Sequence, residues 1–243
     1  MQPPFFHTGF LFHGSLNDFL RTRQKNTRLD FPCRFSSSVK DAIEANGVPH
    51  VEVGKIVVNG KEKPFDYLLQ PGDEIDVFPY ERQLPAGSPA RFVLDVHLGG
   101  LARRLRMLGI DTIYRNDLHD PEIIAIATTE NRVVLTRDVG LLKHKLLQWG
   151  YWLRSQQSEE QLLEVISRFS LCNYLQPFMR CIACNGLLAT VAKNEIVELL
   201  PEKTRLFFEE FYRCTACGKI YWKGSHYQDM LRSVERIRSV ACQ

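Results

Sequence analysis

The stretch RFVLDVHLGGLARRLRMLGIDTIYRNDLHDPEIIAIATTENRVVLTRDVGLLKH, residues 91–144, decides the fold. Short apolar runs in it lead to Asp95, Asp117 and Asp138, and helical patterns fill the gaps between these runs. This alternation predicts a parallel sheet with helices on its faces. Right-handed crossovers point consecutive strands the same way, so we expect the three carboxylates at the carboxyl edge of the sheet, where open α/β sheets bind ligands.

Converging carboxylates repel one another unless a cation joins them, and Mg²⁺ and Mn²⁺ prefer oxygen ligands. We therefore predict that Asp95, Asp117 and Asp138 are catalytic and hold Mg²⁺ or Mn²⁺ for chemistry on phosphoesters. Each also has a structural interpretation, as a helix cap for Asp95 and Asp138 and as a loop residue for Asp117. Asp120, the predicted N-cap of the next helix, and Glu122, in its first turn, are secondary catalytic candidates.

The helix expected after Asp95 carries basic residues beside its apolar stripe. The stripe has leucines at i, i+3, i+7 and i+10, namely Leu98, Leu101, Leu105 and Leu108. Arg103, Arg104 and Arg106 lie on other faces, where they either form a solvated surface or contact phosphate. Arg137 and Lys143, on either side of the helix start at Asp138, are further candidates for substrate contact.

Residues 1–84 form a first module with a ββαββ pattern. The order of strand, helix, VVNG and LQPGDEIDVFP resembles the ubiquitin-like β-grasp fold of sulfur and molybdopterin carriers. A carrier needs a free Gly-Gly end, but this module continues through a Pro/Gly/Ser-rich linker, residues 85–90. We therefore expect the module to bind a protein partner or to support the next domain.

Residues 176–243 contain two C-x-x-C pairs, Cys181/Cys184 and Cys214/Cys217. Four thiolates in this pattern predict a structural zinc ribbon, because they leave no coordination position open for catalysis. Trp222 and His226 follow the second pair, where aromatic residues beside basic charge suit single-stranded RNA or, equally, the packing of a small ribbon. The remaining cysteines, Cys33, Cys172 and Cys242, have no matching neighbours and are interpreted as ordinary thiols.

The motifs RFVLDVHLGGLARRLRMLGIDTIY, ND-x-x-D-x-E and VVLTRD-x-GLLK together resemble the Mut7-C RNase domain, a divergent branch of the PIN-like nucleases. The resemblance implies a PIN-like nuclease core over 91–175, preceded by a ubiquitin-like module and followed by a zinc ribbon with a C-terminal helix. It also implies RNA cleavage by the clustered acids, with Asp95, Asp117 and Asp138 as metal ligands.

Composition limits the remaining alternatives. The net charge is +3, and residues 176–243 carry 10 Lys+Arg against 7 Asp+Glu, which permits RNA binding without establishing it. No apolar run is long enough to cross a membrane. The sequence also lacks the Gly-rich phosphate loop that would indicate a nucleotide cofactor. The paired cysteines favour a reducing cytoplasm. Two other functions remain open: a non-catalytic RNA- or ribosome-binding adaptor, and a small-molecule phosphatase. The phosphatase is disfavoured because Asp95-Val96-His97 lacks the second Asp of an aspartyl-phosphate hydrolase motif.

Overall fold

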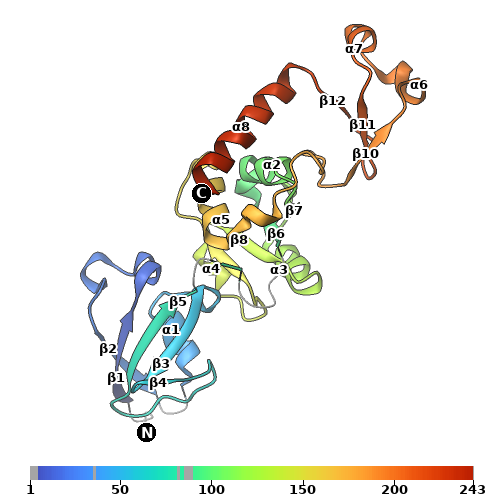
Figure 1. Ribbon diagram of the computed structural model, residues 1–243. Helices are drawn as coiled ribbons and strands as arrows, with labels where there is room; N and C mark the ends of the chain where they lie inside the picture. The colour runs from blue at the N-terminus through green and yellow to red at the C-terminus, as the bar shows by residue number, and fades with distance from the viewer. Residues whose placement is uncertain (1–4, 35–36, 81–82, 85–89, 243) are drawn as a thin grey trace.

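The computed structural model describes residues 5–34, 37–80, 83–84 and 90–242. Three parts follow one another along an elongated molecule: an N-terminal sheet domain, a central parallel sheet and a cysteine ribbon at the far end (Figure 1). Most of the predicted linker, 85–89, lies outside the described residues. None of the described helices combines the length and apolar character that crossing a bilayer requires.

The N-terminal domain has the β-grasp arrangement that its sequence predicts. Its elements are β1 (Phe5–Phe12), β2 (Leu29–Arg34), α1 (Val39–Ala45), β3 (Val53–Val58), β4 (Lys61–Glu62) and β5 (Glu74–Pro79). The sheet order is β2-β1-β5-β3-β4, with β1 parallel to β5. The Ser38 hydroxyl caps α1 by accepting a hydrogen bond from the Asp41 backbone N–H. Phe10, Phe12 and Ile43 belong to the buried core between sheet and helix.

The central domain is a parallel sheet flanked by helices, as predicted, and the sheet has four strands. The strands are β6 (Arg91–Leu94), β7 (Asp111–Ile113), β8 (Val133–Thr136) and β9 (Gly150–Trp152), in the order β7-β6-β8-β9. The helices are α2 (Gly99–Met107), α3 (Asp120–Thr129), α4 (Val139–Leu142) and α5 (Ser158–Phe169). Sequence analysis did not predict β9, whose three residues carry too little periodicity to stand out.

Both faces of this sheet are covered, because its strand residues alternate between two apolar cores. Phe92 and Leu94 point to one core, which contains α2 and α5, whereas Val93 points to the other, which contains α3 and α4. The four predicted stripe leucines of α2 are all buried in the first core. A sheet buried on both faces explains the nearly continuous apolar run RVVLT.

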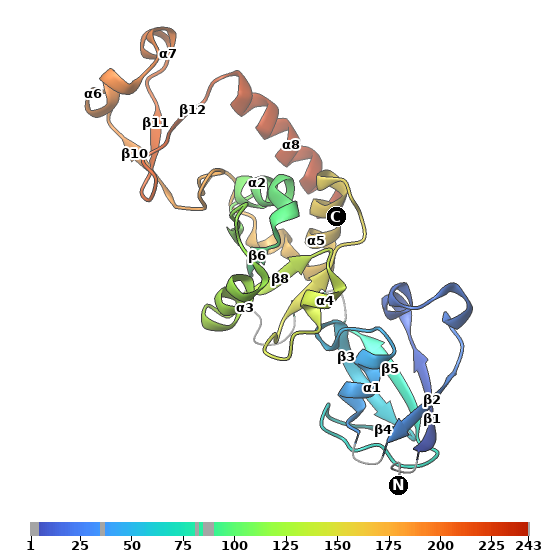
Figure 2. The ribbon, with the colours of Figure 1, turned by 180° about the vertical axis from the view of Figure 1, so that it is seen from behind.

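The C-terminal segment forms a ribbon and then returns to the central domain. Its elements are β10 (Leu188–Val191), α6 (Lys193–Ile196), α7 (Glu202–Phe207), β11 (Phe211–Cys214), β12 (Ile220–Trp222) and α8 (Ser225–Ala241). The views from front and back both show α8 running from the ribbon to the central domain (Figures 1 and 2). Val234 and Ile237 of α8 join the α2–α5 core, so the sequence boundary at 175/176 does not separate packing units.

A disulfide joins Cys172 to Cys242 and fastens the end of α8 beside α5. The interpretation of these two cysteines as ordinary thiols is therefore wrong. Their pairing was not visible in the sequence because 70 residues separate them and neither has a C-x-x-C neighbour. Cys33 is a free, buried thiol, as expected.

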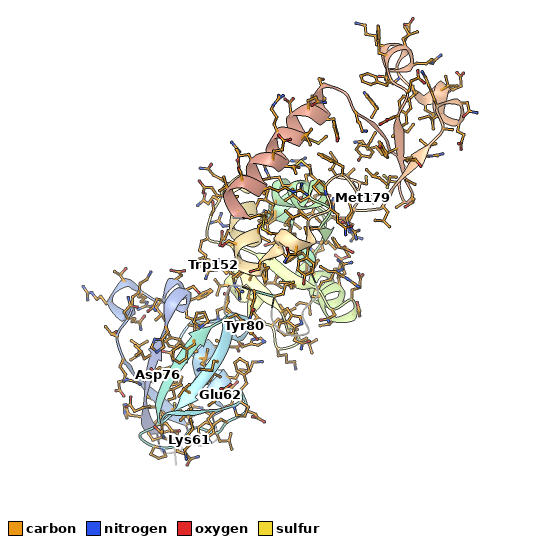
Figure 3. All side chains as sticks on the ribbon, in the orientation of Figure 1. Lys61, Glu62, Asp76, Tyr80, Trp152 and Met179 are labelled. Atoms are coloured by element: carbon orange, nitrogen blue, oxygen red, sulfur yellow. A yellow bond between two sulfur atoms is a disulfide. The ribbon has the colours of Figure 1, made fainter. Side chains whose placement is uncertain are left out.

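The β-grasp domain packs directly on the central sheet at β9. Tyr80 and Trp152 lie at this junction (Figure 3), and the backbone N–H of Trp152 donates to the buried Glu52 carboxylate at 2.6 Å. His50 Nε2 lies 2.9 Å from the carbonyl oxygen of Leu147, and Val51 enters the α3–α4 core. The first module thus supplies part of the second domain's packing.

Lys143 belongs to the same junction. Its ammonium group donates to the backbone carbonyl of Glu44, at the end of α1, at 2.8 Å. The side chain is half-buried and engaged with the neighbouring domain, and its predicted contact with substrate stays a prediction.

Candidate active site and zinc ribbon

Asp95 and Asp138 follow adjacent parallel strands, β6 and β8, and the hydroxyl of Thr136 links them. This hydroxyl donates to Oδ2 of Asp95 at 2.7 Å and accepts from the backbone N–H of Asp138 at 2.8 Å. Asp95 is 8% exposed and makes no helix-capping hydrogen bond, so its proposed role as a cap finds no support. Thr136 is a site residue that sequence reasoning missed, although its position two residues before Asp138 was a signal.

These two acids open onto a hollow of about 550 Å³, which we call the acid hollow. Its other charged or titratable lining residues are Asp120, His97, His119 and Arg137. The carboxylate of Asp120 is exposed and has no hydrogen bond or ion pair within the described structure. The acid hollow therefore gathers three of the five predicted catalytic acids and Arg137.

Asp138 also has a structural task. Its Oδ1 accepts from the backbone N–H of Gly140 at 2.7 Å and caps α4. One oxygen caps the helix, while the exposed carboxylate still faces the acid hollow. The two interpretations of Asp138 are thus compatible.

Asp117 and Glu122 form ion pairs with Arg115. Arg115 donates to Asp117 at 3.1 Å and to Glu122 at 2.9 Å, and Asp117 lines a neighbouring hollow. The backbone N–H of His119 donates to Glu122, and this contact, with the Arg115 charge, lowers the pKa of the Glu122 carboxyl below its ordinary value. The cap of α3 is therefore His119 with Glu122, which corrects the prediction of Asp120 as N-cap.

The described carboxylates do not form a tight cluster of three. Within the described ranges, the four cysteines are the one group of three or more ligand side chains close enough to hold a single ion. Asp95, Asp117 and Asp138 are not brought together, because Asp117 lies four residues beyond the end of β7 and pairs with Arg115. The carboxylates that face the acid hollow supply oxygen donors, which suit Mg²⁺ or Mn²⁺, and His97 and His119 line the hollow beside them.

The four predicted zinc ligands meet as their spacing requires. Their sulfur atoms all lie within 4.8 Å of one another, with Cys181–Cys217 at 3.7 Å and Cys184–Cys214 at 3.4 Å. A tetrahedral zinc with Zn–S bonds of about 2.3 Å places its sulfurs about 3.8 Å apart, so the residues fit zinc. Burial disfavours the Cys181 thiolate, but hydrogen bonds from the Tyr221 hydroxyl and nearby backbone amides bring the pKa of Cys181 down to about 6.

The turns that carry Cys181/Cys184 and Cys214/Cys217 are the first and second zinc knuckles. Arg106 fastens the first knuckle to the central domain. Its side chain is 2% exposed, and its guanidinium group donates to four backbone carbonyls, those of Thr112, Tyr114, Ile182 and Ala183. Arg106 therefore has a structural task. Because it also lines the hollow that contains Asp117, its predicted contact with phosphate stays a prediction. Helical periodicity placed this residue away from the leucine stripe, but the knuckle, more than 70 residues later, covers it.

A second contact docks the knuckle on the edge strand β7. The side-chain oxygen of Asn185 accepts from the Thr112 N–H at 3.0 Å, and its NH₂ group donates to Asp111 at 2.8 Å. Arg132 and Arg180 also bind the Asp111 carboxylate. Burial works to raise the pKa of Asp111, but these hydrogen bonds and charges outweigh it and lower the pKa.

The remaining substrate-binding candidates lie at the surface or in shallow hollows. Arg103 is exposed and lines the same hollow as Asp117, whereas Arg104 donates to the Ser158 hydroxyl at 3.1 Å. Trp222 lines an apolar hollow of about 300 Å³ between the ribbon and α8. His226 is exposed in the first turn of α8.

The protein thus combines a parallel α/β domain, whose acids lie at the carboxyl edge where such sheets bind ligands, with a four-cysteine ribbon. The family model of the Mut7-C RNAse domain matches residues 90–234, and the model of the Mut7-C ubiquitin domain matches residues 7–85. The chain therefore belongs to the Mut7-C RNAse domain family, in the predicted order of domains, and this family suggests a nuclease. No curated protein and no solved structure matches the chain.

Proposed function

We propose that this protein is a metal-dependent ribonuclease whose active centre is the acid hollow. The observation that carries the proposal is the convergence of Asp95, Asp120 and Asp138 on one hollow, in a chain whose family is that of an RNAse domain. Asp95 and Asp138 would be the principal metal ligands, and Asp120, which lines the same hollow, would be a further one. Asp117 and Glu122 keep the segment before α3 in place through Arg115.

A bound Mg²⁺ or Mn²⁺ supplies an activated water and stabilises charge that develops on the phosphate. The protein's own groups prepare this reaction. Thr136 holds the Asp95 carboxylate in one orientation by a hydrogen bond, and the cap of α4 orients Asp138. Arg137, exposed in the lining of the hollow, is placed to neutralise a non-bridging phosphate oxygen, and His97 or His119 is placed to move a proton.

The ubiquitin-like domain and the ribbon have supporting roles in this proposal. The domain packs on β9 through Glu52 and on the segment before β9 through His50, and the family assignment suggests that it also interacts with a protein partner. Zinc in the ribbon is structural, since four cysteines saturate it.

The decisive experiment compares RNA cleavage in Mn²⁺, in Mg²⁺ and in EDTA. Single-stranded and hairpin RNAs are incubated with the wild type and with Asp95→Asn, Asp120→Asn and Asp138→Asn. We expect metal-dependent cleavage that falls at least 100-fold in Asp95→Asn and Asp138→Asn, since each variant removes an anionic metal ligand. Glu62→Gln is the matched control, because Glu62 is an exposed carboxylate of β4 at the far end of the β-grasp domain (Figure 3).

Two results would contradict the proposal. Cleavage that persists undiminished in EDTA excludes the metal mechanism, and full activity in both Asp95→Asn and Asp138→Asn excludes the acid hollow. RNA binding without any cleavage under all metal conditions would instead favour the adaptor function.

A further inference from the structure

We infer that a second hollow, next to the acid hollow, binds the phosphate backbone of the RNA beside the cleavage position. This inference rests on the proposed ribonuclease function and deepens it by naming a substrate subsite. The second hollow, which we call the basic hollow, has a volume of about 720 Å³. The residues that matter to the argument are Gly99, Arg103, Arg115, Asn116, Asp117 and Lys219.

Its charge is opposite to that of the acid hollow. Three exposed cations, Arg103, Arg115 and Lys219, line it, against the single carboxylate of Asp117. Arg103 has no ion pair or hydrogen bond within the described structure, and Lys219 lies over the ring of Tyr221 at 5.9 Å. Cations without acidic partners are free to exchange water and counterions for phosphate oxygens.

The two hollows adjoin along the chain at two places. Asp95, Val96 and His97 line the acid hollow, and Gly99 lines the basic one. Asp117 lines the basic hollow and the next residue, Leu118, lines the acid one. Because neighbouring residues line the two hollows, a polynucleotide whose scissile phosphate lies in the acid hollow can continue into the basic hollow.

Contacts between domains hold the walls of the basic hollow in place. Lys219 comes from the second zinc knuckle, and the first knuckle contributes Ile182 and Ala183, whose carbonyls Arg106 binds. On the opposite wall, the Tyr114 hydroxyl donates to the carbonyl of Val96, the residue after Asp95, at 2.9 Å. The ribbon and the catalytic loop thus form one preorganised surface, and the zinc ribbon takes part in binding RNA rather than only in folding.

The test measures binding and cleavage separately. A fluorescently labelled single-stranded RNA is titrated with the zinc-loaded protein and followed by anisotropy. The buffer contains no chelator and no added Mg²⁺ or Mn²⁺, so that metal-dependent cleavage does not occur, and the titration is repeated at several salt concentrations. The double variant Arg103→Gln/Lys219→Gln removes one cation from α2 and one from the second knuckle. The matched control, Arg23→Gln/Lys61→Gln, removes two exposed cations from the β-grasp domain.

We expect the double variant to bind RNA about tenfold or more weakly, and the slope of log K against log salt to fall in magnitude by about 1.4, because each phosphate contact on a single strand contributes about 0.7. In Mn²⁺, KM should rise while kcat is retained. The control should keep the wild-type Kd and slope. A double variant with the wild-type Kd and salt slope would overturn the basic hollow, whereas absence of cleavage by the wild type itself would overturn the ribonuclease proposal.

Discussion

Arg106 offers the sharpest test of how the zinc ribbon is attached to the central domain. Replacing it by Met keeps the volume and apolar stem but removes the guanidinium group that binds four backbone carbonyls. The ribbon and the core then lose the hydrogen bonds of Arg106, whereas the contacts of Asn185 with Thr112 and Asp111 remain. The zinc ligands themselves are untouched.

The expected cost follows from these four hydrogen bonds. Hydrogen bonds to a charged group contribute roughly 1.5–3 kcal/mol each, and a buried carbonyl left unpaired costs about 1–3 kcal/mol. Thr112 is fully buried, so its carbonyl stays unpaired, whereas Ala183 is exposed and its carbonyl regains water. Because such terms are not additive, we expect Arg106→Met to lower the free energy of unfolding by about 3–5 kcal/mol.

Urea unfolding of the zinc-loaded full-length chain, followed by circular dichroism, measures this loss. Transfer of zinc to a chromogenic chelator should also be faster in Arg106→Met, because the first knuckle loses the hydrogen bonds that its carbonyls accept from Arg106. Arg103→Met is the matched control on the same helix: it removes an exposed guanidinium without partners and should change stability by less than about 0.5 kcal/mol. Equal unfolding midpoints for the two variants would refute this account of Arg106.

Three further changes test other parts of the structure. Burial of Glu52 raises its pKa despite the charge of Arg154, so the folded state should lose stability as pH rises above about 4.5. In urea unfolding at several pH values, the free energy of unfolding of Glu52→Gln should therefore increase relative to that of the wild type as pH rises. Glu52→Ala leaves the Trp152 N–H unpaired and should cost about 1–3 kcal/mol. Cys172→Ser opens a 70-residue loop, which should cost about 2–4 kcal/mol in thermal unfolding without reducing zinc content measured by mass spectrometry. Chelation of zinc should unfold the ribbon first, seen as early loss of hydrogen-exchange protection at β11; unchanged protection there would contradict a structural zinc.

The pattern of residues along the chain was enough to predict the main elements. Alternation and apolar runs gave β6 and β8, since a strand buried on both faces must be apolar throughout. The two C-x-x-C pairs predicted the cysteine cluster, because the spacing within each pair lets a knuckle present both thiolates to one ion. The β-grasp order likewise followed from local strand, turn and helix signals.

Sequence alone also selected Asp95 and Asp138, because Asp95 directly follows β6, Asp138 lies two residues beyond β8, and parallel strands end at one edge. It ranked Asp117 above Asp120, whereas in the described structure Asp120 lines the acid hollow and Asp117 pairs with Arg115. Asp117 lies in a loop, and only the folded structure shows that Arg115 forms ion pairs with both Asp117 and Glu122. Periodicity describes positions along one element and carries no information about such loop contacts.

What tertiary structure decided was the burial of charged and polar groups by distant segments. Arg106 occupies a polar position of its helix, yet the first zinc knuckle covers it; Lys143 resembles a surface lysine, yet it contacts α1 of the β-grasp domain. Cys172 and Cys242 pair only because α8 returns to α5. In each case the partner lies about 70 or more residues away, where a one-dimensional pattern holds no signal. The sequence therefore determined which elements form and which chemistry they carry, and their packing determined which of the candidate residues face a ligand.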